Sequence, residues 1–412
     1  MVSDVHPVSF PTRVLHLLNL DTVGGVEQLF FHLITGCAVE PGQEDHCLVT
    51  GGRVHAHFAD LNRRLASLAY AKSWMGIKLP RQPHGLRAWH VRNVLRRVQP
   101  GVAVLWNRFG DESSVASLHA AGCPVIHYEH GAAWLAPHSE ARQQFLARVQ
   151  SVVCISRAAQ RVLQLRWGYA GRSHVVPNAL RPDLAATEAR PKTLPRDRPT
   201  RLGIAARLIP LKGIGVALHA LRELRRRGCK VELQVAGTGP LLPFLEAEAR
   251  QLGVTEVVTF LGVVRDMAAF FDNVDLLLVP AVREPFGLVI IEAAARGCPS
   301  ICGQVDGMPE AVRPNRTGIC LTPTLELDRA PEFGGTQADF PPLVYDPEGD
   351  RLVPPRFLDP QALAAAVEGL IATPERYTAM SASAIEHARG DFSMQAYAHR
   401  LRDVFAATLA GG

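Results

Sequence analysis

Short apolar segments alternate with helical segments along this chain, and this alternation constrains the fold more than any other feature of the sequence. Segments such as VAVLW (102–106), PVIHYEH (124–130) and DLLLVP (275–280) are apolar at most positions. A strand with no polar face must be covered on both faces, as happens in a parallel sheet between two layers of helices. The sequence therefore predicts an α/β fold built from doubly wound parallel sheets.

The strand-like segments fall into two series. The first comprises RVLHLLNL (13–20), CLVT (47–50), VAVLW, PVIHYEH, SVVCIS (151–156) and HVVP (174–177). The second comprises RLGIAAR (201–207), KVELQVAG (230–237), VVTFLG (257–262), DLLLVP and PSICG (299–303). The stretch between them, residues 181–200, is rich in proline and charge, as interdomain linkers are.

A chain of 412 residues is also too long for one ordinary core. We therefore expect an N-terminal Rossmann-like domain over residues 1–180, a linker over 181–200 and a C-terminal Rossmann-like domain over 201–393. Two such domains in tandem predict a ligand bound between them, at the carboxyl ends of the strands. Residues 322–355 have many prolines and no helical period, and we interpret them as an irregular insertion, either a loop or a hairpin.

The composition is typical of a well-packed protein that is soluble in water, with 47% apolar and 20% charged residues. No apolar run is long enough to span a bilayer, and the first residues, MVSDVHPVSFPTR, lack the pattern of a signal peptide. The eight cysteines are scattered and form no CxxC pair, which favours a reducing cytoplasm. The net charge of +5 is too small to indicate a nucleic-acid partner.

One stretch of the chain is strongly basic, because no acidic residue occurs between Leu61 and Gly110. Its basic residues include Arg63, Arg64, Lys72, Lys78, Arg81, Arg87, Arg92, Arg96 and Arg97, with Trp74 and Trp89 among them. One interpretation is a solvated helical face with ordinary core tryptophans. The other is a surface that binds anionic lipid headgroups, as a peripheral protein at the inner face of the membrane would, or that attracts an anionic acceptor.

Two glutamates lie on either side of the apolar run PFGLVII, eight residues apart. Glu284 falls in the turn after the strand DLLLVP, and Glu292 falls on a helix that begins near Phe286 and Gly287. The unpaired N–H groups at such a helix start, with a glycine that lets a ligand approach, suit a diphosphate. Glu284 can then accept hydrogen bonds from the hydroxyls of a sugar and Glu292 from those of a ribose, an arrangement that suits a nucleotide sugar.

Two cations follow the first strand of the second series. Arg207 ends RLGIAAR, and Lys212 comes before the next helix in LIPLKG. Both can neutralise a diphosphate directly. The chain contains no Asp-x-Asp pair that would hold a divalent metal against a diphosphate. We therefore expect no metal and no cofactor, with these two cations and the helix dipole in the role of the metal.

The glycines of AGTGP (236–240) are a turn before a helix rather than a dinucleotide fingerprint, because Pro240 follows and no third glycine comes at the required spacing. A dehydrogenase is therefore disfavoured. Ser156 is expected to cap a helix and not to act as a nucleophile, since no GxSxG surrounds it.

These motifs, in this order, resemble those of the retaining glycosyltransferases of the GT-B class often called family 4. The second half carries ARLIPLKG, AGTGP, EPFGLVIIE (284–292) and DGMPE (306–310), and the first half carries GGVE (24–27), EHG (129–131), CIS (154–156) and VPN (176–178). The resemblance covers most of the chain. It implies two Rossmann-like domains that face a central cleft, with the C-terminal helix over residues 394–409 packed back onto the N-terminal domain.

The resemblance also implies roles for single residues. Gly24 and Gly25 would approach the diphosphate and sugar of the donor, and His130 would lie near the reacting carbon. Arg207 and Lys212 would bind the diphosphate. Glu284 would hold the sugar and distal phosphate together with the backbone of Phe286, Gly287 and Leu288, and Glu292 would hold the ribose. Against this, a lone histidine at a strand end, such as His130, is more often a structural one.

The implied activity is transfer of a hexosyl unit from a nucleoside diphosphate sugar to a hydroxyl acceptor, with retention of configuration and without a metal. A bacterial glycan, a lipid-linked oligosaccharide or a polysaccharide would be the product. Two alternatives stay open: an epimerase acting on a nucleotide sugar, and a catalytically silent scaffold protein of the same fold. The sequence names neither the nucleotide, nor the sugar, nor the acceptor.

Overall fold

The computed structural model describes residues 12–36, 44–50, 54–59, 61, 66–67, 73–74, 77–78, 92–186 and 188–410. The described chain divides into two compact units. The first unit contains the described parts of Met1–Ile155, Leu163–Pro177 and Met394–Gly412, and the second contains Ser156–Val162 and the described parts of Asn178–Ser393.

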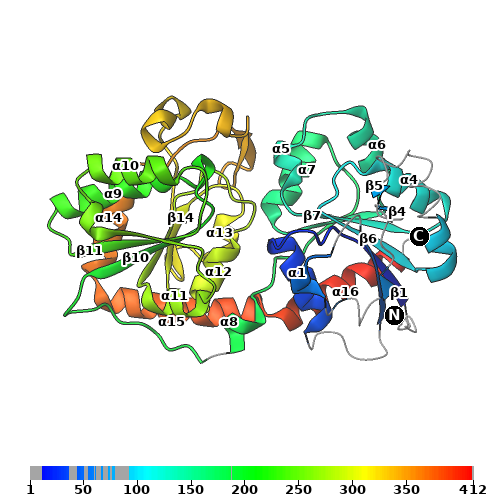
Figure 1. Cartoon of the computed structure of the whole chain (residues 1–412), viewed down its shortest axis with the longest axis horizontal. Helices are drawn as coiled ribbons and strands as arrows, with labels where there is room; N and C mark the ends of the chain where they lie inside the picture. Colours follow the sequence, from blue (N-terminus) through cyan, green and yellow to red (C-terminus); the bar gives the residue numbers. More distant parts are fainter. Residues whose placement is uncertain are drawn as a thin grey trace, which may run out of the picture. The chain divides into compact units, whose positions relative to one another are not determined.

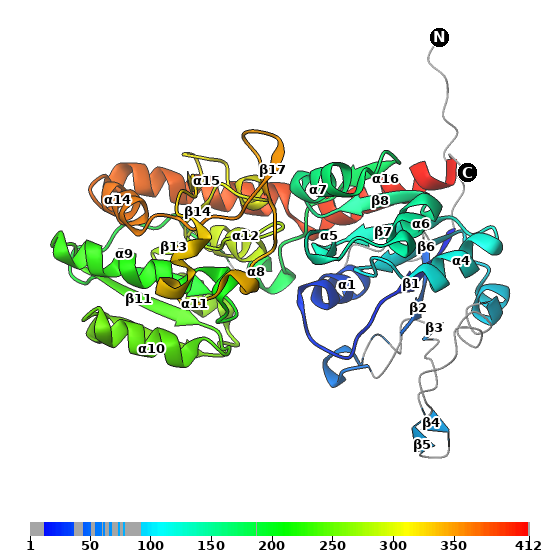
Figure 2. The same cartoon turned by 90° about the horizontal axis from the view of Figure 1, so that it is seen from above.

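Within its described residues, the first unit is built on a seven-stranded parallel sheet in the order β3-β2-β1-β6-β7-β8-β9, and Figure 2 shows the strands from β3 to β8 side by side. Its strands are β1 (Thr12–Leu17), β2 (Glu44–Val49), β3 (Ala66–Ser67), β6 (Val102–Trp106), β7 (Val125–Glu129), β8 (Ser151–Cys154) and β9 (Ser173–Val175). The strand order reverses between β1 and β6, which is the point where doubly wound sheets bind ligands. Every residue of β6 and β7 is buried, so these strands are apolar at most positions.

Helices cover both faces of this sheet (Figure 1). The labelled helices of this unit are α1 (Gly25–Thr35), α4 (Glu112–Ala120), α5 (Ala132–Leu135), α6 (Glu140–Arg148), α7 (Arg157–Trp167) and α16 (Met394–Ala410). The first turns of α7 belong to the second unit. The first unit also contains the 3₁₀ turn η1 (Ala56–Phe58) and a short hairpin of β4 (Ser73–Trp74) and β5 (Ile77–Lys78). The last helix, α16, lies in the first unit, where Thr408 Oγ1 is 2.9 Å from Ser151 Oγ.

Over the residues described, the second unit has a six-stranded parallel sheet in the order β12-β11-β10-β13-β14-β15. Its strands are β10 (Thr200–Ala205), β11 (Val231–Ala236), β12 (Val258–Gly262), β13 (Leu276–Val279), β14 (Ser300–Gly303) and β15 (Gly318–Leu321). This order repeats that of the first unit, with the reversal between β10 and β13. The structure thus confirms the predicted pair of doubly wound α/β sheets.

Figure 1 shows α9 and α10 over one face of the second sheet, and α11 and α15 over the other. The helices of this unit are α8 (Pro182–Ala186), α9 (Ile214–Arg226), α10 (Leu242–Gln251), α11 (Met267–Asn273), α12 (Leu288–Ala294), α13 (Met308–Ala311), α14 (Pro360–Ile371) and α15 (Pro374–Asp391). Its 3₁₀ turns are η2 (Pro210–Lys212), η3 (Thr255–Val257), η4 (Leu327–Phe333) and η5 (Gln337–Asp339).

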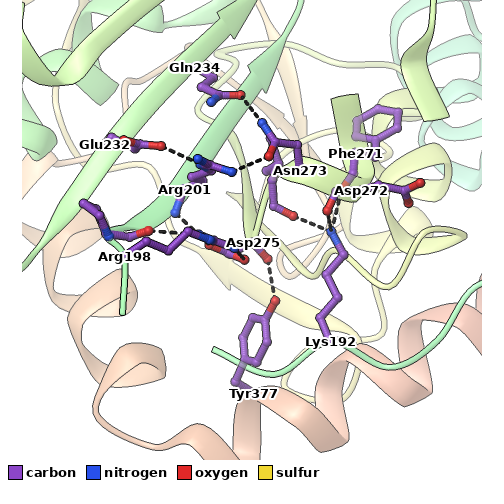
Figure 3. A network of polar contacts seen from close by, with 12 residues as sticks. Lys192, Arg198, Arg201, Glu232, Gln234, Phe271, Asp272, Asn273, Asp275 and Tyr377 are labelled. Carbon is purple, nitrogen blue, oxygen red and sulfur yellow. Dashed lines mark hydrogen bonds and ion pairs between the residues drawn. The ribbon is translucent and has the colours of Figure 1, made fainter. Parts of the chain in front are cut away.

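Residues 181–200, interpreted as a linker, are part of the second unit. Their polar side chains form hydrogen bonds near the amino ends of β10 and β13 (Figure 3). Lys192 donates from Nζ to the carbonyl oxygens of Phe271, Asp272 and Val274 at the end of α11. Arg198 makes a two-pronged ion pair with Asp275, at 2.7 and 2.9 Å. Residues that are 77 to 82 positions apart in the chain are therefore joined here.

Residues 322–355 are ordered into η4, η5 and a hairpin of β16 (Val344–Asp346) and β17 (Arg351–Val353). Phe333 and Phe340 from this insertion both pack against Phe357, with ring centroids 4.9 and 5.2 Å apart. All three side chains are buried and belong to the core of the second unit. The insertion therefore has an apolar anchor of its own.

Part of the basic stretch between Leu61 and Gly110, including Arg63, Arg64, Lys72, Arg81 and Arg87, lies outside the described residues, so its interpretation as a lipid-binding surface stays a prediction. Arg92, Arg96 and Arg97 are described and are exposed on a helix over residues 92–98. Among the described residues, no helix is both long enough and apolar enough to cross a membrane.

Candidate active site

Three of the predicted site residues follow two neighbouring strands of the second sheet. Arg207 comes just after β10, Lys212 lies in η2, and Glu284 comes after β13, which pairs with β10. The carboxyl ends of parallel neighbours meet at one edge, so these side chains lie on the ligand-binding edge of the sheet. Lys212 Nζ is 2.6 Å from Glu284 Oε2, and both side chains keep about a fifth of their surface exposed (23% and 18%).

The Glu284 carboxyl is held in its charged form. Burial by itself would raise its pKa, but the positive charge and hydrogen bond of Lys212, the charge of Arg283 and the backbone N–H of Phe286 outweigh burial, so the pKa is lowered. Glu284 is therefore a charged hydrogen-bond acceptor at neutral pH, with Oε2 turned to Lys212. Such a group suits donors such as sugar hydroxyls.

Two glycines allow the positive φ angles that the backbone adopts near Lys212 and Glu284. Gly213 has φ of 65° after Lys212, and a Cβ there would lie 2.0 Å from the carbonyl oxygen of Pro280. Gly287 has φ of 102° before α12, and a Cβ there would lie 2.8 Å from Ile290 Cδ1. A side chain at Gly213 would collide with the backbone, and a side chain at Gly287 would be strained by the positive φ and would displace the end of Ile290.

Arg207 is exposed, and its side chain makes no hydrogen bond or ion pair with the residues that the structure describes. A guanidinium in this state keeps all five N–H donors available for an anion. Its position after β10 puts this unused capacity at the same sheet edge as Lys212.

Glu292 lies on α12, as predicted, and is partly buried. Burial raises its pKa to about 7, with the charge of Arg181 opposing this rise and that of Asp183 adding to it. The carboxyl is therefore close to half protonated at neutral pH and can both donate and accept a hydrogen bond.

Phe286 is buried, with its ring 5.6 Å from the ring of Phe392. Gly287 precedes α12, and Leu288 is the first residue of that helix. The backbone of these three residues therefore continues directly from Glu284, at the same edge of the sheet.

The remaining predicted residues belong to the first unit. His130 follows β7, and its ring lies 5.7 Å from that of Trp106 and 4.3 Å from that of Tyr128. Burial lowers its pKa to about 3, against the opposing charge of Glu129, so the imidazole is neutral. Its Nε2 is buried and has no hydrogen-bond partner among the described residues. This leaves one polar atom of the ring for a ligand or a water.

Glu129 explains how the loop that carries His130 is held, which the sequence analysis missed. Its carboxylate is fully buried; Oε1 accepts from the backbone N–H of Gly131 and Ala133 at 2.6 and 3.0 Å, and Oε2 lies 3.1 Å from His127 Nε2. Gly131 has φ of 109°. The signal in the sequence was an acid at the end of a strand that also contains His127, since a charge in a buried strand must have partners.

Gly24 and Gly25 lie at the start of α1, where Gly24 is the residue before the helix. Gly24 has an extended backbone, and its carbonyl accepts the first helical hydrogen bond, from Gln28 N at 3.0 Å. A Cβ on Gly24 would lie 2.6 Å from Glu27 Oε2. Glu27 is an acidic residue in the first turn of α1.

Of the predicted set, the structure brings Lys212 and Glu284 into direct contact, and Phe286, Gly287 and Leu288 follow Glu284 in the chain after Pro285. His130, Gly24 and Gly25 belong to the other unit. Their roles toward a shared ligand stay predictions.

Comparison with known families accounts for both units. Residues 186–330 match the family model described as "Glycosyl transferases group 1", and residues 23–184 match "Glycosyltransferase Family 4". The two matches together cover most of the chain. The chain belongs to the group 1 glycosyltransferases.

Curated relatives of the chain are glycosyltransferases. A glycogen synthase of Mycobacterium tuberculosis is 35% identical over 131 residues, which is 31% of this chain and 32% of the relative. A GDP-mannose-dependent phosphatidylinositol monomannoside mannosyltransferase of the same species is 36% identical over 151 residues, or 34% and 39%. A D-inositol 3-phosphate glycosyltransferase of Segniliparus rotundus is 30% identical over 217 residues, or 51% and 40%. These matches span only about a third to two-fifths of the relatives' own length.

Solved structures share the fold over nearly the whole chain. A glycosyltransferase from Rickettsia africae has a TM-score of 0.74 at 13% identity, covering 98% of this chain and all of that one. The Anabaena protein HepE in complex with UDP and glucose has a TM-score of 0.69 at 17% identity, covering 96% of this chain and all of that one. The two doubly wound sheets are therefore those of the GT-B fold.

Proposed function

We propose that this glycosyltransferase transfers a hexosyl unit from a nucleoside diphosphate sugar to a hydroxyl acceptor, with retention of configuration and without a divalent metal. The contact between Lys212 and Glu284 at the sheet edge carries this proposal. It joins a cation that suits a diphosphate to a charged acceptor that suits sugar hydroxyls, in a chain of this family.

Lys212 donates one N–H to Glu284 and has two further donors for phosphate oxygens. Arg207 adds a guanidinium with no competing partner among the described side chains. When the bond between sugar and phosphate breaks, negative charge develops on the departing diphosphate. Two cations already in place stabilise that charge with little reorganisation, so they lower the barrier of the chemical step.

The leaving phosphate accepts the proton of the acceptor hydroxyl on the same face of the sugar, so the proposed reaction needs no nucleophile from the protein. Glu284 holds the sugar through its hydroxyls, together with the backbone at Phe286, Gly287 and Leu288. Glu292 takes the ribose hydroxyls. A carboxyl with a pKa of about 7 can exchange hydrogen bonds with a vicinal diol in either protonation state.

In the first unit, we assign His130 the role of a neutral hydrogen-bonding group near the reacting carbon. Its depressed pKa and the unpartnered Nε2 among the described atoms support this assignment. Gly24 and Gly25 would let the start of α1 approach the donor. The acceptor is proposed as a glycan or a lipid-linked glycan at the cytoplasmic face of a membrane.

The names of the relatives and solved structures support a class of donor but not one particular donor. One is named for its dependence on GDP-mannose, and one solved structure holds UDP and glucose. We therefore propose a nucleoside diphosphate hexose as the donor, with the base and the sugar to be found by experiment.

The test is release of nucleoside diphosphate from a panel of UDP-, GDP- and ADP-sugars in the presence of EDTA. Slow hydrolysis of one donor by the wild type, lost in Lys212→Ala and Glu284→Ala, is the expected result. Lys230→Ala is the matched control, because this lysine is exposed and lies at the opposite, amino end of β11. Absence of both turnover and donor binding in the wild type would overturn the proposal and favour a silent scaffold protein.

A further inference from the structure

A buried aspartate links Glu284 to the insertion. Asp306 lies in the loop after β14 and is fully buried, with its carboxylate between two other segments of the second unit. Oδ2 accepts from the backbone N–H of Glu284 at 3.2 Å, and Oδ1 accepts from the backbone N–H of Tyr345 at 2.8 Å. Tyr345 is on β16, the first strand of the hairpin in the insertion.

Backbone hydrogen bonds run beside the carboxylate and complete the link. The Asp306 N–H donates to the carbonyl of Tyr345 at 2.9 Å, and the Gly307 N–H donates to the carbonyl of Glu284 at 3.1 Å. Glu284 is thus held through both its N–H and its C=O. Three segments that are far apart in the sequence meet at one side chain.

The backbone of Asp306 shows that this arrangement is specific. Its φ is +50°, in the left-handed region that is unfavourable for residues with a side chain. Glycine would adopt this conformation without strain but would offer no carboxylate. A buried carboxylate must also be matched by donors, and here two backbone N–H groups meet it through charge-assisted bonds.

We propose that Asp306 is a positioning residue for donor recognition, through which the insertion fixes the backbone of Glu284. This inference rests on the proposed function, because it takes Glu284 to hold the sugar of the donor. Asp306 is fully buried, so it acts through Glu284 and does not touch the ligand. The insertion gains a role in sugar recognition without supplying a side chain to the site.

Two substitutions separate the carboxylate from the backbone conformation. Asp306→Gly keeps the left-handed conformation accessible and removes both acceptors, and Asp306→Asn keeps the size but has only one acceptor oxygen for two N–H groups. Asp346→Asn is the matched control. Asp346 belongs to the same hairpin and also accepts two backbone N–H bonds, from Glu348 and Gly349 at 3.1 Å each, but makes none to Glu284.

The first measurement is amide hydrogen exchange over residues 283–287, which needs no ligand. We expect faster exchange there in both Asp306 variants and wild-type exchange in Asp346→Asn. The second measurement is calorimetric affinity for the donor sugar nucleotide and for the free nucleoside diphosphate. Affinity for the sugar nucleotide should fall ~10-fold in the Asp306 variants, as expected for one strong hydrogen bond, while affinity for the free nucleoside diphosphate, which lacks the sugar, falls less.

The outcomes are separable. Unchanged exchange over residues 283–287 in Asp306→Gly would overturn the inference whether or not any donor binds. An equal loss of affinity for both ligands, with a lowered unfolding temperature, would also overturn it by showing a purely structural role. Failure of the wild type to bind any sugar nucleotide would instead count against the proposed function, and faster exchange in the variants would still confirm the link itself.

Discussion

Charged residues lie at both ends of the strands β10 and β13, but they are more completely paired at the amino end than at the carboxyl end. At the amino end, Asp275 is 3% exposed and accepts three hydrogen bonds, two from the guanidinium of Arg198 and one from the backbone N–H of Arg201. At the carboxyl end, Lys212 and Glu284 make one contact with each other, and Arg207 has no side-chain partner among the described residues.

This difference indicates that the charged groups at the amino end stabilise the fold, whereas those at the carboxyl end remain able to bind a ligand. A buried carboxylate with three protein donors, such as Asp275, stabilises the fold and is not accessible to a ligand. A partly paired group such as Lys212 contributes less to stability and retains donors. Incomplete pairing of charged groups is typical of functional sites, so the comparison favours the carboxyl end as the candidate site without reference to any relative.

Removal of the buried carboxylate at the amino end should have the largest effect on stability. Asp275→Ala leaves the Arg198 guanidinium and the Arg201 N–H without their acceptor, so the free energy of unfolding should fall by about 3 kcal/mol, at the low end of the range because Arg198 is still partly exposed. Urea denaturation measures the loss. Donor affinity of the folded protein should be unchanged; a specific loss of donor binding would contradict the division between the two ends.

The two arginines give a matched pair for the next prediction. Arg207→Ala should lower donor turnover about 100-fold, because a cation is lost where charge develops, and should leave the unfolding temperature unaltered. Arg198→Ala should do the reverse, with lower stability and normal turnover per folded molecule. Steady-state kinetics and thermal unfolding on both variants measure this. Parallel losses in the two assays would refute the comparison.

Glu292 gives the smallest effect, on the dependence of stability on pH. Its pKa is raised to about 7 from an ordinary 4.5, so the folded chain holds this proton over a range where the unfolded chain has lost it. Stability should therefore fall as pH rises from 4.5 to about 7 and level off above that. A shift of this size corresponds to about 3 kcal/mol at most, and because solvent reaches the partly exposed carboxyl we expect a change on the order of 1 kcal/mol. Denaturation at a series of pH values should show a flatter profile for Glu292→Gln; an identical slope would exclude Glu292 as the cause.

The strands were predictable because their physical requirement is simple. A strand buried on both faces has to be apolar, and VAVLW was predicted over the residues that β6 occupies. Several elements were missed, including β15 and α15 of the second unit. The strand β15 (GICL) is short and mostly half-buried, and α15 buries small or polar side chains such as Ser381, Ala384 and Ala388, so neither has a clear apolar period.

Long-range polar pairing was not predictable. Residues 181–200 have the composition of a linker, yet Lys192 and Arg198 bind carbonyls and a carboxylate almost 80 positions away. Composition reports the local preference of a segment and says nothing about a partner elsewhere in the chain.

The residues of the candidate site likewise include some that were predictable from the sequence and some that were not. Lys212 and Glu284 were predictable because each follows a strand, and neighbouring strands end at one edge. Their contact joins residues 72 positions apart, and the structure shows it directly. Asp306 was not predictable as a positioning residue, since its role depends on a backbone angle and on the N–H of Tyr345, neither of which leaves a mark in the sequence.

The location of α16 has a consequence for the order of events during synthesis. This helix buries Tyr397, Leu401, Val404 and Phe405, and it contacts the first unit through Thr408 and β6. A ribosome makes it only after the whole second unit, and at 5–20 residues per second roughly ten seconds or more pass between Val175 and Met394. During that interval the nascent first unit exposes the apolar surface that α16 will cover. Nascent chains should therefore need a chaperone there until the last turn of α16 is released.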